Sequence, residues 1–128
     1  MKKVLLVDDN PANMHLVRFI LKKHGYEVIE AINGLDGVKA AIEEHPDLVL
    51  MDIQLPDIHG LEATKRIKES REAGKIPVIA LTSYAMTGDK ERALEAGCDG
   101  YISKPISVDT FIAHIEQYLP VTSGSVAG

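Results

Sequence analysis

Leu48-Val49-Leu50-Met51-Asp52-Ile53-Gln54-Leu55-Pro56 is an apolar run that contains one carboxylate. Pro46 lies shortly before this run and Pro56 closes it, so its length and flanks predict a buried central strand that ends near Asp52. Burying a carboxylate costs free energy unless a partner compensates its charge. Taken alone, Asp52 would be interpreted as a residue that caps the following loop.

Two other apolar runs also end in polar side chains. Val4-Leu5-Leu6-Val7 is followed by Asp8-Asp9, and Val78-Ile79-Ala80-Leu81 is followed by Thr82-Ser83. In a parallel sheet, the carboxyl ends of the strands lie at one edge, where ligands bind. The three runs therefore predict one shared site at one edge of a sheet.

Strand-like and helix-like patterns alternate five times along the chain. The expected strands cover 4–7, 26–31, 48–52, 78–81 and 100–103, and the expected helices cover 12–24, 35–44, 61–72, 89–96 and a last segment capped by Ser107. Asn10-Pro11 predicts the start of the first helix. This alternation favours an α/β fold with a five-stranded parallel sheet, flavodoxin-like strand order 2-1-3-4-5, and helices on both faces. That order puts the ligand site between the first and third strands.

Composition and charge limit the class of protein. The 128 residues suffice for one domain with a core, and we expect residues 1–120 to form it and residues 121–128 to be a flexible tail or linker. The net charge of −5 does not favour a nucleic-acid partner or an anionic membrane surface. A single Cys and the lack of a long apolar run predict a cytoplasmic protein without a membrane span.

The residue types at the predicted edge favour a particular chemistry. Neighbouring carboxylates repel one another, and a cation relieves that repulsion. Oxygen-only ligands favour a hard ion such as Mg²⁺. Lys104 after the fifth strand and the hydroxyl of Thr82 add a positive charge and a hydrogen-bond donor. This set suits transfer of a phosphoryl group to Asp52, which would attack as the nucleophile.

Four motifs carry a resemblance to a known family. They are Val7-Asp8-Asp9-Asn10, the strand Leu50–Pro56 with Gly60, Ala80-Leu81-Thr82-Ser83, and Tyr101-Ile102-Ser103-Lys104-Pro105. Across about residues 3–119, the chain resembles the CheY-like receiver domain of two-component response regulators. The strings at 52–56, 85–89 and 97–107 are similar to those of DivK-type single-domain regulators of bacterial cell-cycle control.

The resemblance implies that Asp52 accepts a phosphoryl group from a histidine kinase or phosphotransfer protein. It implies that Mg²⁺ is bound by the side chains of Asp9 and Asp52 and by the backbone carbonyl of Gln54, with Asp8 acting partly through water. The aspartyl-phosphate would be a signal in a switch protein, and the chain would not be an enzyme with a substrate of its own.

The resemblance also assigns the remaining site residues. Thr82 would be the switch hydroxyl, Lys104 the phosphate partner, and Tyr101 the aromatic residue whose rotamer reports phosphorylation. Output would be protein binding through the face formed by the fourth helix, fifth strand and fifth helix. A strand Tyr is commonly just half-buried core, so that interpretation of Tyr101 stays open. So does a second context, in which the tail from Val121 is a cut linker of a larger regulator or hybrid kinase.

Other functions on the same fold fit the residues less well. A flavin mononucleotide site needs a hydroxyl- and glycine-rich loop after the first strand, where Asp8-Asp9 would repel phosphate. A haloacid-dehalogenase-type phosphatase needs Asp-x-Asp there, and the phosphate-binding loop of nucleotide hydrolases is absent. The five His residues have no mutual ligand spacing, and Cys98 is expected to be a small buried hydrophobic residue.

Overall fold

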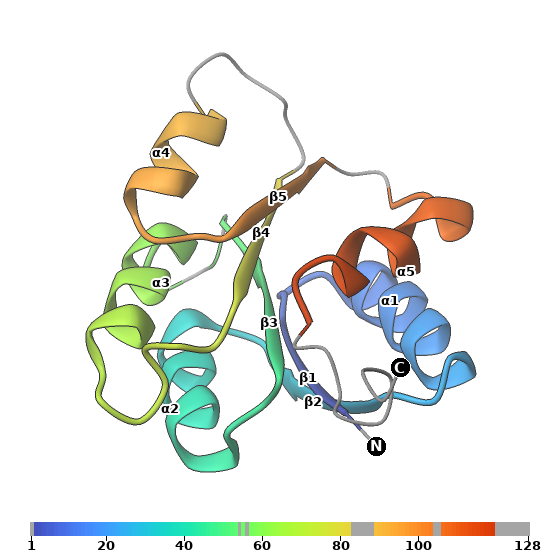
Figure 1. The fold of residues 1–128 in the computed structure, drawn as a ribbon, viewed down its shortest axis with the longest axis horizontal. Helices are drawn as coiled ribbons and strands as arrows, with labels where there is room; N and C mark the ends of the chain where they lie inside the picture. Colours follow the sequence, from blue (N-terminus) through green and yellow to red (C-terminus); the bar gives the residue numbers. More distant parts are fainter. Residues whose placement is uncertain (1, 54, 56, 83–88, 104–105, 120–128) are drawn as a thin grey trace, which may run out of the picture.

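In the computed structural model, helices flank a single twisted sheet (Figure 1). The structure describes residues 2–53, 55, 57–82, 89–103 and 106–119. The strands are β1 (Lys3–Val7), β2 (Glu27–Ala31), β3 (Leu48–Asp52), β4 (Val78–Thr82) and β5 (Gly100–Ser103). The helices are α1 (Pro11–Lys23), α2 (Gly34–Glu44), α3 (Gly60–Glu69), α4 (Asp89–Glu95) and α5 (Val108–Glu116).

The strand order is β2-β1-β3-β4-β5 and every pairing is parallel, which confirms the predicted order. The register aligns the carboxyl ends of the inner strands. Val7 lies opposite Met51 in the β1–β3 pair, and Asp52 lies opposite Leu81 in the β3–β4 pair. The residues that follow β1 and those that end β3 and β4 therefore meet at one edge of the sheet.

Two apolar layers cover the two faces of the sheet. Alternate strand residues such as Leu48 and Leu50 pack with α1 and α5, while Val49 and Met51 pack with α2, α3 and α4. Figure 1 shows these two groups of helices on opposite sides. All five residues of β3 are buried, because a parallel strand covered on both faces needs apolar side chains in both directions. This explains why the run 48–51 is continuously apolar.

Most predicted boundaries agree with the structure within one residue, but the end of the third helix does not. The third helix was expected to extend to Glu72, but α3 ends at Glu69. The Ser70 hydroxyl donates to the Ile67 carbonyl at 2.8 Å and accepts from the Ala73 backbone N–H at 2.9 Å, so a serine side chain replaces the next helical hydrogen bonds. Ser107 occupies the N-cap position of α5, as predicted, but its side chain makes no capping hydrogen bond.

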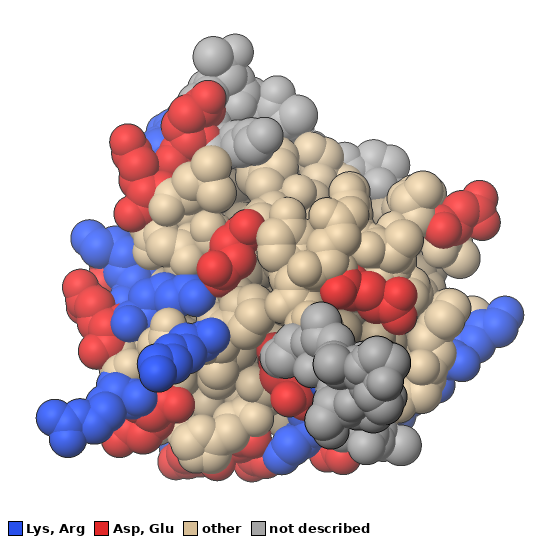
Figure 2. Space-filling view, viewed as in Figure 1, with Lys and Arg blue, Asp and Glu red and all other residues tan. Residues whose placement is uncertain are grey.

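The surface around α2 and α3 carries interspersed acidic and basic side chains (Figure 2). The charged run from Lys65 to Glu72 predicts only a solvated helix face. Lys68 departs from this pattern, because only 18% of its side chain is exposed.

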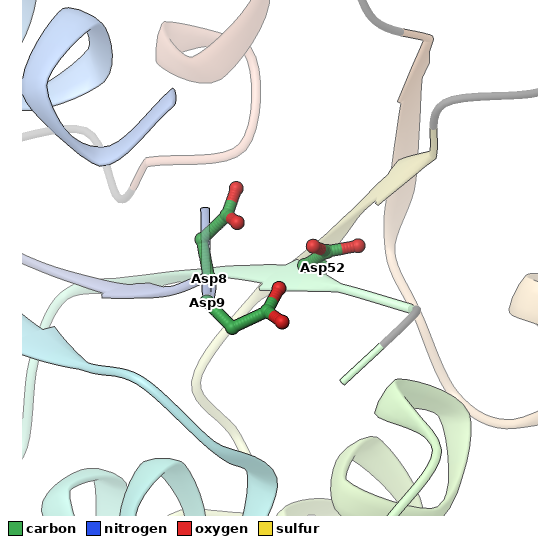
Figure 3. A group of neighbouring side chains, drawn as sticks. All are labelled: Asp8, Asp9 and Asp52. Carbon is green, nitrogen blue, oxygen red and sulfur yellow. The ribbon is translucent and has the colours of Figure 1, made fainter. Parts of the chain in front are cut away.

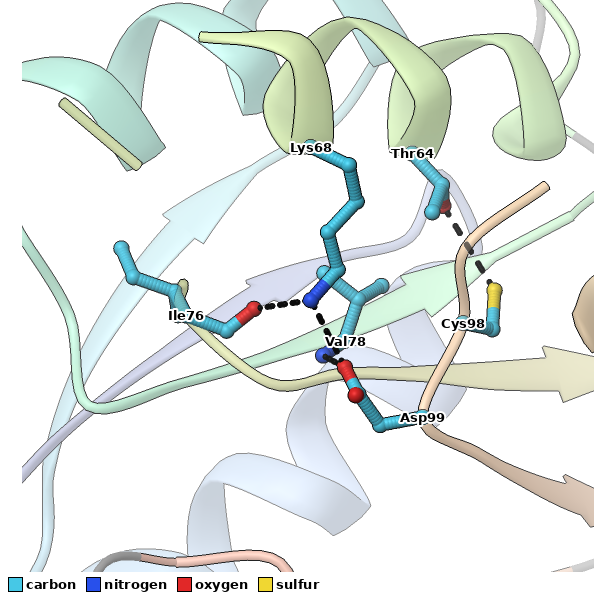
Figure 4. Close-up of polar contacts among 6 residues, drawn as sticks. All are labelled: Thr64, Lys68, Ile76, Val78, Cys98 and Asp99. Carbon is cyan, nitrogen blue, oxygen red and sulfur yellow. Dashed lines mark hydrogen bonds and ion pairs between the residues drawn. The ribbon is translucent and has the colours of Figure 1, made fainter. Parts of the chain in front are cut away.

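Lys68 ties α3 to the amino ends of β4 and β5 (Figure 4). Its ammonium group donates to the Ile76 carbonyl at 2.7 Å and to the Asp99 carboxylate at 2.8 Å. The same Asp99 oxygen accepts from the Val78 backbone N–H at 2.9 Å. This cluster closes the end of the sheet that lies opposite the polar edge.

We predict that Lys68→Met destabilises the fold by about 1–3 kcal/mol, because it leaves the Ile76 carbonyl and the Asp99 carboxylate without their charged donor. Lys65→Met is the matched control, since Lys65 is exposed on the same helix. Urea unfolding of both variants measures the difference. Equal stabilities of the two variants would contradict the structural role of Lys68.

Candidate metal centre

Three carboxylates meet at the polar edge of the sheet (Figure 3). Asp8 and Asp9 directly follow β1, and Asp52 is the last residue of β3. Each offers one oxygen, and these atoms all lie within 4.8 Å of one another. Because β1 and β3 are neighbours in the sheet, carboxylates more than forty residues apart in the sequence become one cluster, as the sequence predicts.

The cluster is largely removed from water. Asp8 is 0% exposed and Asp52 is 4% exposed, whereas Asp9 is exposed. Ionised carboxylates this close repel one another, and burial strengthens the repulsion because the local dielectric constant is low. The donor set fits a hard cation: ligands on opposite sides of Mg²⁺ lie about 4.2 Å apart, twice its usual bond length to oxygen. The observed spacing suits an ion held directly or through water.

The first turn of α1 holds Asp8 in place. The Asn10 backbone N–H donates to Oδ1 of Asp8 at 2.9 Å, and the Asn13 side-chain amide donates to Oδ2 at 3.0 Å. As predicted, Asn10 is the N-cap: its side chain accepts from the Asn13 backbone N–H, and Pro11 begins the helix. The role of Asn13 was missed. The available signal was its place in the first turn of a helix that starts directly behind the acid pair.

The other predicted site residues divide into two groups. Thr82 ends β4 at the same edge and is 1% exposed, and Tyr101 lies on β5, half-buried against the apolar layer of α2, α3 and α4. This packing suits the core interpretation of Tyr101. Gln54 and Lys104 lie outside the described residues. The predictions for those two residues are therefore not tested by the geometry.

The turn between β3 and α3 packs directly against Asp52. The Gly60 backbone N–H donates to the Ile53 carbonyl at 3.0 Å, and a Cβ atom on Gly60 would fall on the backbone carbonyl oxygen of Asp52. The Thr64 hydroxyl donates to the Gly60 carbonyl at 2.9 Å and joins this turn to the body of α3. Only a residue without a side chain allows this approach.

Asp57 fastens the same turn to α2. Its two carboxylate oxygens accept from the backbone N–H groups of Gly34 at 2.7 Å and Leu35 at 2.9 Å. Asn33 accepts from the Asp36 N–H at 2.8 Å, so these two side chains satisfy the first three N–H groups of α2. Partial loss of hydration tends to raise the pKa of Asp57, but the backbone hydrogen bonds outweigh it and lower that pKa. This long-range cap was not predicted.

The His residues lie at the surface and Cys98 is buried, as predicted. All five His residues are exposed and are remote from any common ligand geometry in the described chain. Cys98 is 4% exposed, and its thiol donates to the Thr64 hydroxyl at 3.7 Å. Burial raises the pKa of the Cys98 thiol, which is typical of an unreactive core cysteine.

The fold and the acidic edge agree with what sequence comparison finds. The family model of the response regulator receiver domain matches residues 4–116, and the chain belongs to this family. Among curated proteins, it is similar to the polar-differentiation response regulator DivK of Brucella ovis and of Brucella anthropi. Each is 52% identical over 118 residues, which cover 92% of this chain and 96% of the relative.

Solved structures give the same result. The receiver domain of a sensor histidine kinase from Pseudomonas aeruginosa has a TM-score of 0.85 and 33% identity, over 91% of this chain and 96% of that one. That structure is described with a magnesium ion coordinated in its active-site cleft. The Vibrio cholerae chemotaxis protein CheY4 has a TM-score of 0.88 and 27% identity, over 93% of this chain and 99% of that one.

Membership in this family makes the chain a signalling protein of two-component systems, with a histidine kinase as its general class of partner, and not a catalytic enzyme. Its three-carboxylate cluster is typical of a magnesium site. Within the described residues, no helix has the length and apolar character needed to cross a membrane.

We predict that Gly60→Ala destabilises the fold by about 1–3 kcal/mol, because the added methyl group forces the turn away from the Asp52 backbone. The same displacement disturbs the spacing of the three carboxylates, so Mg²⁺ affinity falls as well. Urea unfolding and a Mg²⁺ titration measure the two effects. Wild-type stability and wild-type affinity would together contradict the close packing of Gly60.

Proposed function

We propose that the chain is a DivK-like phosphorylation switch in which Asp52 accepts a phosphoryl group from a histidine kinase or phosphotransfer protein. The observation that carries this proposal is the position of Asp52. It is a nearly buried carboxylate at the end of the central strand, and its oxygen lies within 4.8 Å of those of two other carboxylates. The strand order reverses at this point, which is where this class of sheet binds ligands.

The proposed ion is Mg²⁺, held by the side chains of Asp9 and Asp52 and the backbone carbonyl of Gln54, with Asp8 acting partly through water. The proximity of one oxygen from each of the three carboxylates, within 4.8 Å of one another, supports a shared ion. When bound, Mg²⁺ offsets negative charge on the transferring group and on the carboxylates. Sequence similarity to a receiver domain crystallised with magnesium adds support.

In the proposed reaction, an Oδ atom of Asp52 forms a bond to phosphorus as the phosphorus–nitrogen bond of the donor histidine breaks. The electron pair of that bond stays on the imidazole, which then takes up a proton. A cation bound by the cluster would offset the charge of the Asp52 carboxylate and of the incoming group, so that positioning and charge compensation would supply most of the catalysis.

The proposed switch roles of the remaining residues are those that the family resemblance implies. Thr82, buried at the end of β4, would donate its hydroxyl to the aspartyl-phosphate, and Lys104, which follows β5, would pair with the phosphate charge. Thr82 also pairs with Ser103 of β5, two residues beyond Tyr101. A shift at Thr82 would thus be passed to the Tyr101 rotamer, biasing a two-state equilibrium.

The proposed output is binding of a downstream protein by the α4–β5–α5 face. Leu94 on α4 and Val108 on α5 are exposed apolar residues of these helices, and a bound partner would remove their side chains from water. The proposed working unit is the domain 1–120, in the cytoplasm, with residues 121–128 as a tail or linker. A receiver within a larger regulator or hybrid kinase is the alternative, and the similarity to a sensor-kinase receiver favours it.

Intact-mass analysis after incubation with acetyl phosphate tests the phosphoacceptor. We expect one phosphoryl adduct that requires Mg²⁺, and we expect Asp52→Asn to abolish it, because an amide cannot form the acyl phosphate. Asp57→Asn is the matched control, since Asp57 lies in the adjoining turn and faces α2. That variant should still be phosphorylated.

Two results would contradict the assignment. An adduct that persists in Asp52→Asn would place the modification on another residue. A wild-type chain that gains no adduct at any Mg²⁺ concentration would mean that the acidic cluster does not support phosphoryl transfer from this donor.

A further inference from the structure

We propose that Asn13 is a positioning residue that orients the Asp8 carboxylate toward the divalent cation and thereby sets the affinity of the site for Mg²⁺. This inference rests on the proposed function of the acidic cluster. It assigns a role to a side chain on α1 that is not itself a metal ligand.

The first argument is the burial of Asp8. Its side chain is 0% exposed, so bulk water is not available to orient its carboxylate, and hydrogen bonds from the protein take that role. Oδ1 accepts from the Asn10 backbone N–H and Oδ2 accepts from the Asn13 amide. Two donors on different oxygens define the plane of the carboxylate. A carboxylate oxygen has more than one acceptor site, so an oxygen that accepts a hydrogen bond can also face a cation or its bound water.

The second argument is that the backbone and the side chain of Asn13 have different hydrogen-bond partners. Its backbone N–H donates to the Asn10 side chain at 3.1 Å and so forms part of the helix cap. Its side-chain amide is therefore not needed for capping and reaches back to Asp8. A side chain without an amide would leave the cap intact and remove a donor that helps to orient Asp8.

The chemical consequence is a pre-oriented site. Groups that hydrogen-bond to metal-binding side chains typically change metal affinity by about 10–100-fold when they are removed. Without the Asn13 amide, the Asp8 carboxylate is less firmly oriented, and it is less well compensated against the charges of Asp9 and Asp52. Binding of Mg²⁺ must then order it. We therefore expect the loss in the affinity for Mg²⁺ rather than in the stability of α1.

The experiment compares Asn13→Ala with Asn10→Ala. Asn13→Ala removes a donor to Asp8 and keeps the cap, whereas Asn10→Ala removes the cap and keeps the backbone donor to Asp8. Calorimetric titration with MgCl₂ gives the affinity, and thermal unfolding in a chelator gives the stability. We expect Asn13→Ala to weaken Mg²⁺ binding about 10–100-fold with little change in the unfolding midpoint. Asn10→Ala should lower the midpoint and bind Mg²⁺ nearly as the wild type does.

The outcomes separate this inference from the proposed function. If the wild type binds Mg²⁺ and Asn13→Ala binds it equally well, the role of Asn13 is wrong and the metal site stands. If both variants lose affinity in proportion to their loss of stability, α1 acts only as a scaffold and the inference is also wrong. A wild-type chain that binds no Mg²⁺ would overturn the proposed metal site itself, and the role of Asn13 with it.

Discussion

Repulsion among Asp8, Asp9 and Asp52 is the physical constraint on which the site depends. A parallel sheet brings the ends of its strands together, so the three carboxylates cannot separate without loss of the pairing between β1 and β3. Burial of two of them makes solvation by water too weak to offset their charge. The surrounding structure holds this unfavourable arrangement: the first turn of α1 holds Asp8, and the turn at Gly60 packs against the backbone of Asp52. A bound cation attracts all three carboxylates, and this attraction offsets their mutual repulsion.

The two ends of the sheet are built differently. At the carboxyl end, polar side chains converge on an acidic cluster that can exchange a cation and a phosphoryl group. At the amino end of β4 and β5, Lys68 and Asp99 satisfy one another and neighbouring backbone groups. Thr82 ends β4 at the opposite, carboxyl end of the sheet. The arrangement suits a switch whose chemistry and motion share one edge.

The sequence predicts the strand order, the two-layered core and the meeting of the three acids, because these follow from strong local signals. The uninterrupted apolar runs of β1, β3 and β4 are typical of strands covered on both faces, and each run leads into polar residues. Long-range side-chain contacts leave no such signal. The Asp57 cap on α2, the Asn13 contact with Asp8 and the anchoring by Lys68 involve ordinary polar residues. α3 ends early because the Ser70 side chain hydrogen-bonds to the neighbouring backbone, and helix propensity alone does not predict that bond.

The most direct test of this account is thermal unfolding of the wild type and Asp9→Ala, in a chelator and in Mg²⁺. If repulsion strains the empty cluster, Asp9→Ala is more stable than the wild type in the chelator. Mg²⁺ then stabilises the wild type, by about 2.7 kcal/mol at one hundred times its dissociation constant, and leaves Asp9→Ala almost unchanged, so the order reverses. A wild type that is unaffected by Mg²⁺, or an Asp9→Ala variant that is less stable in the chelator, would contradict the account.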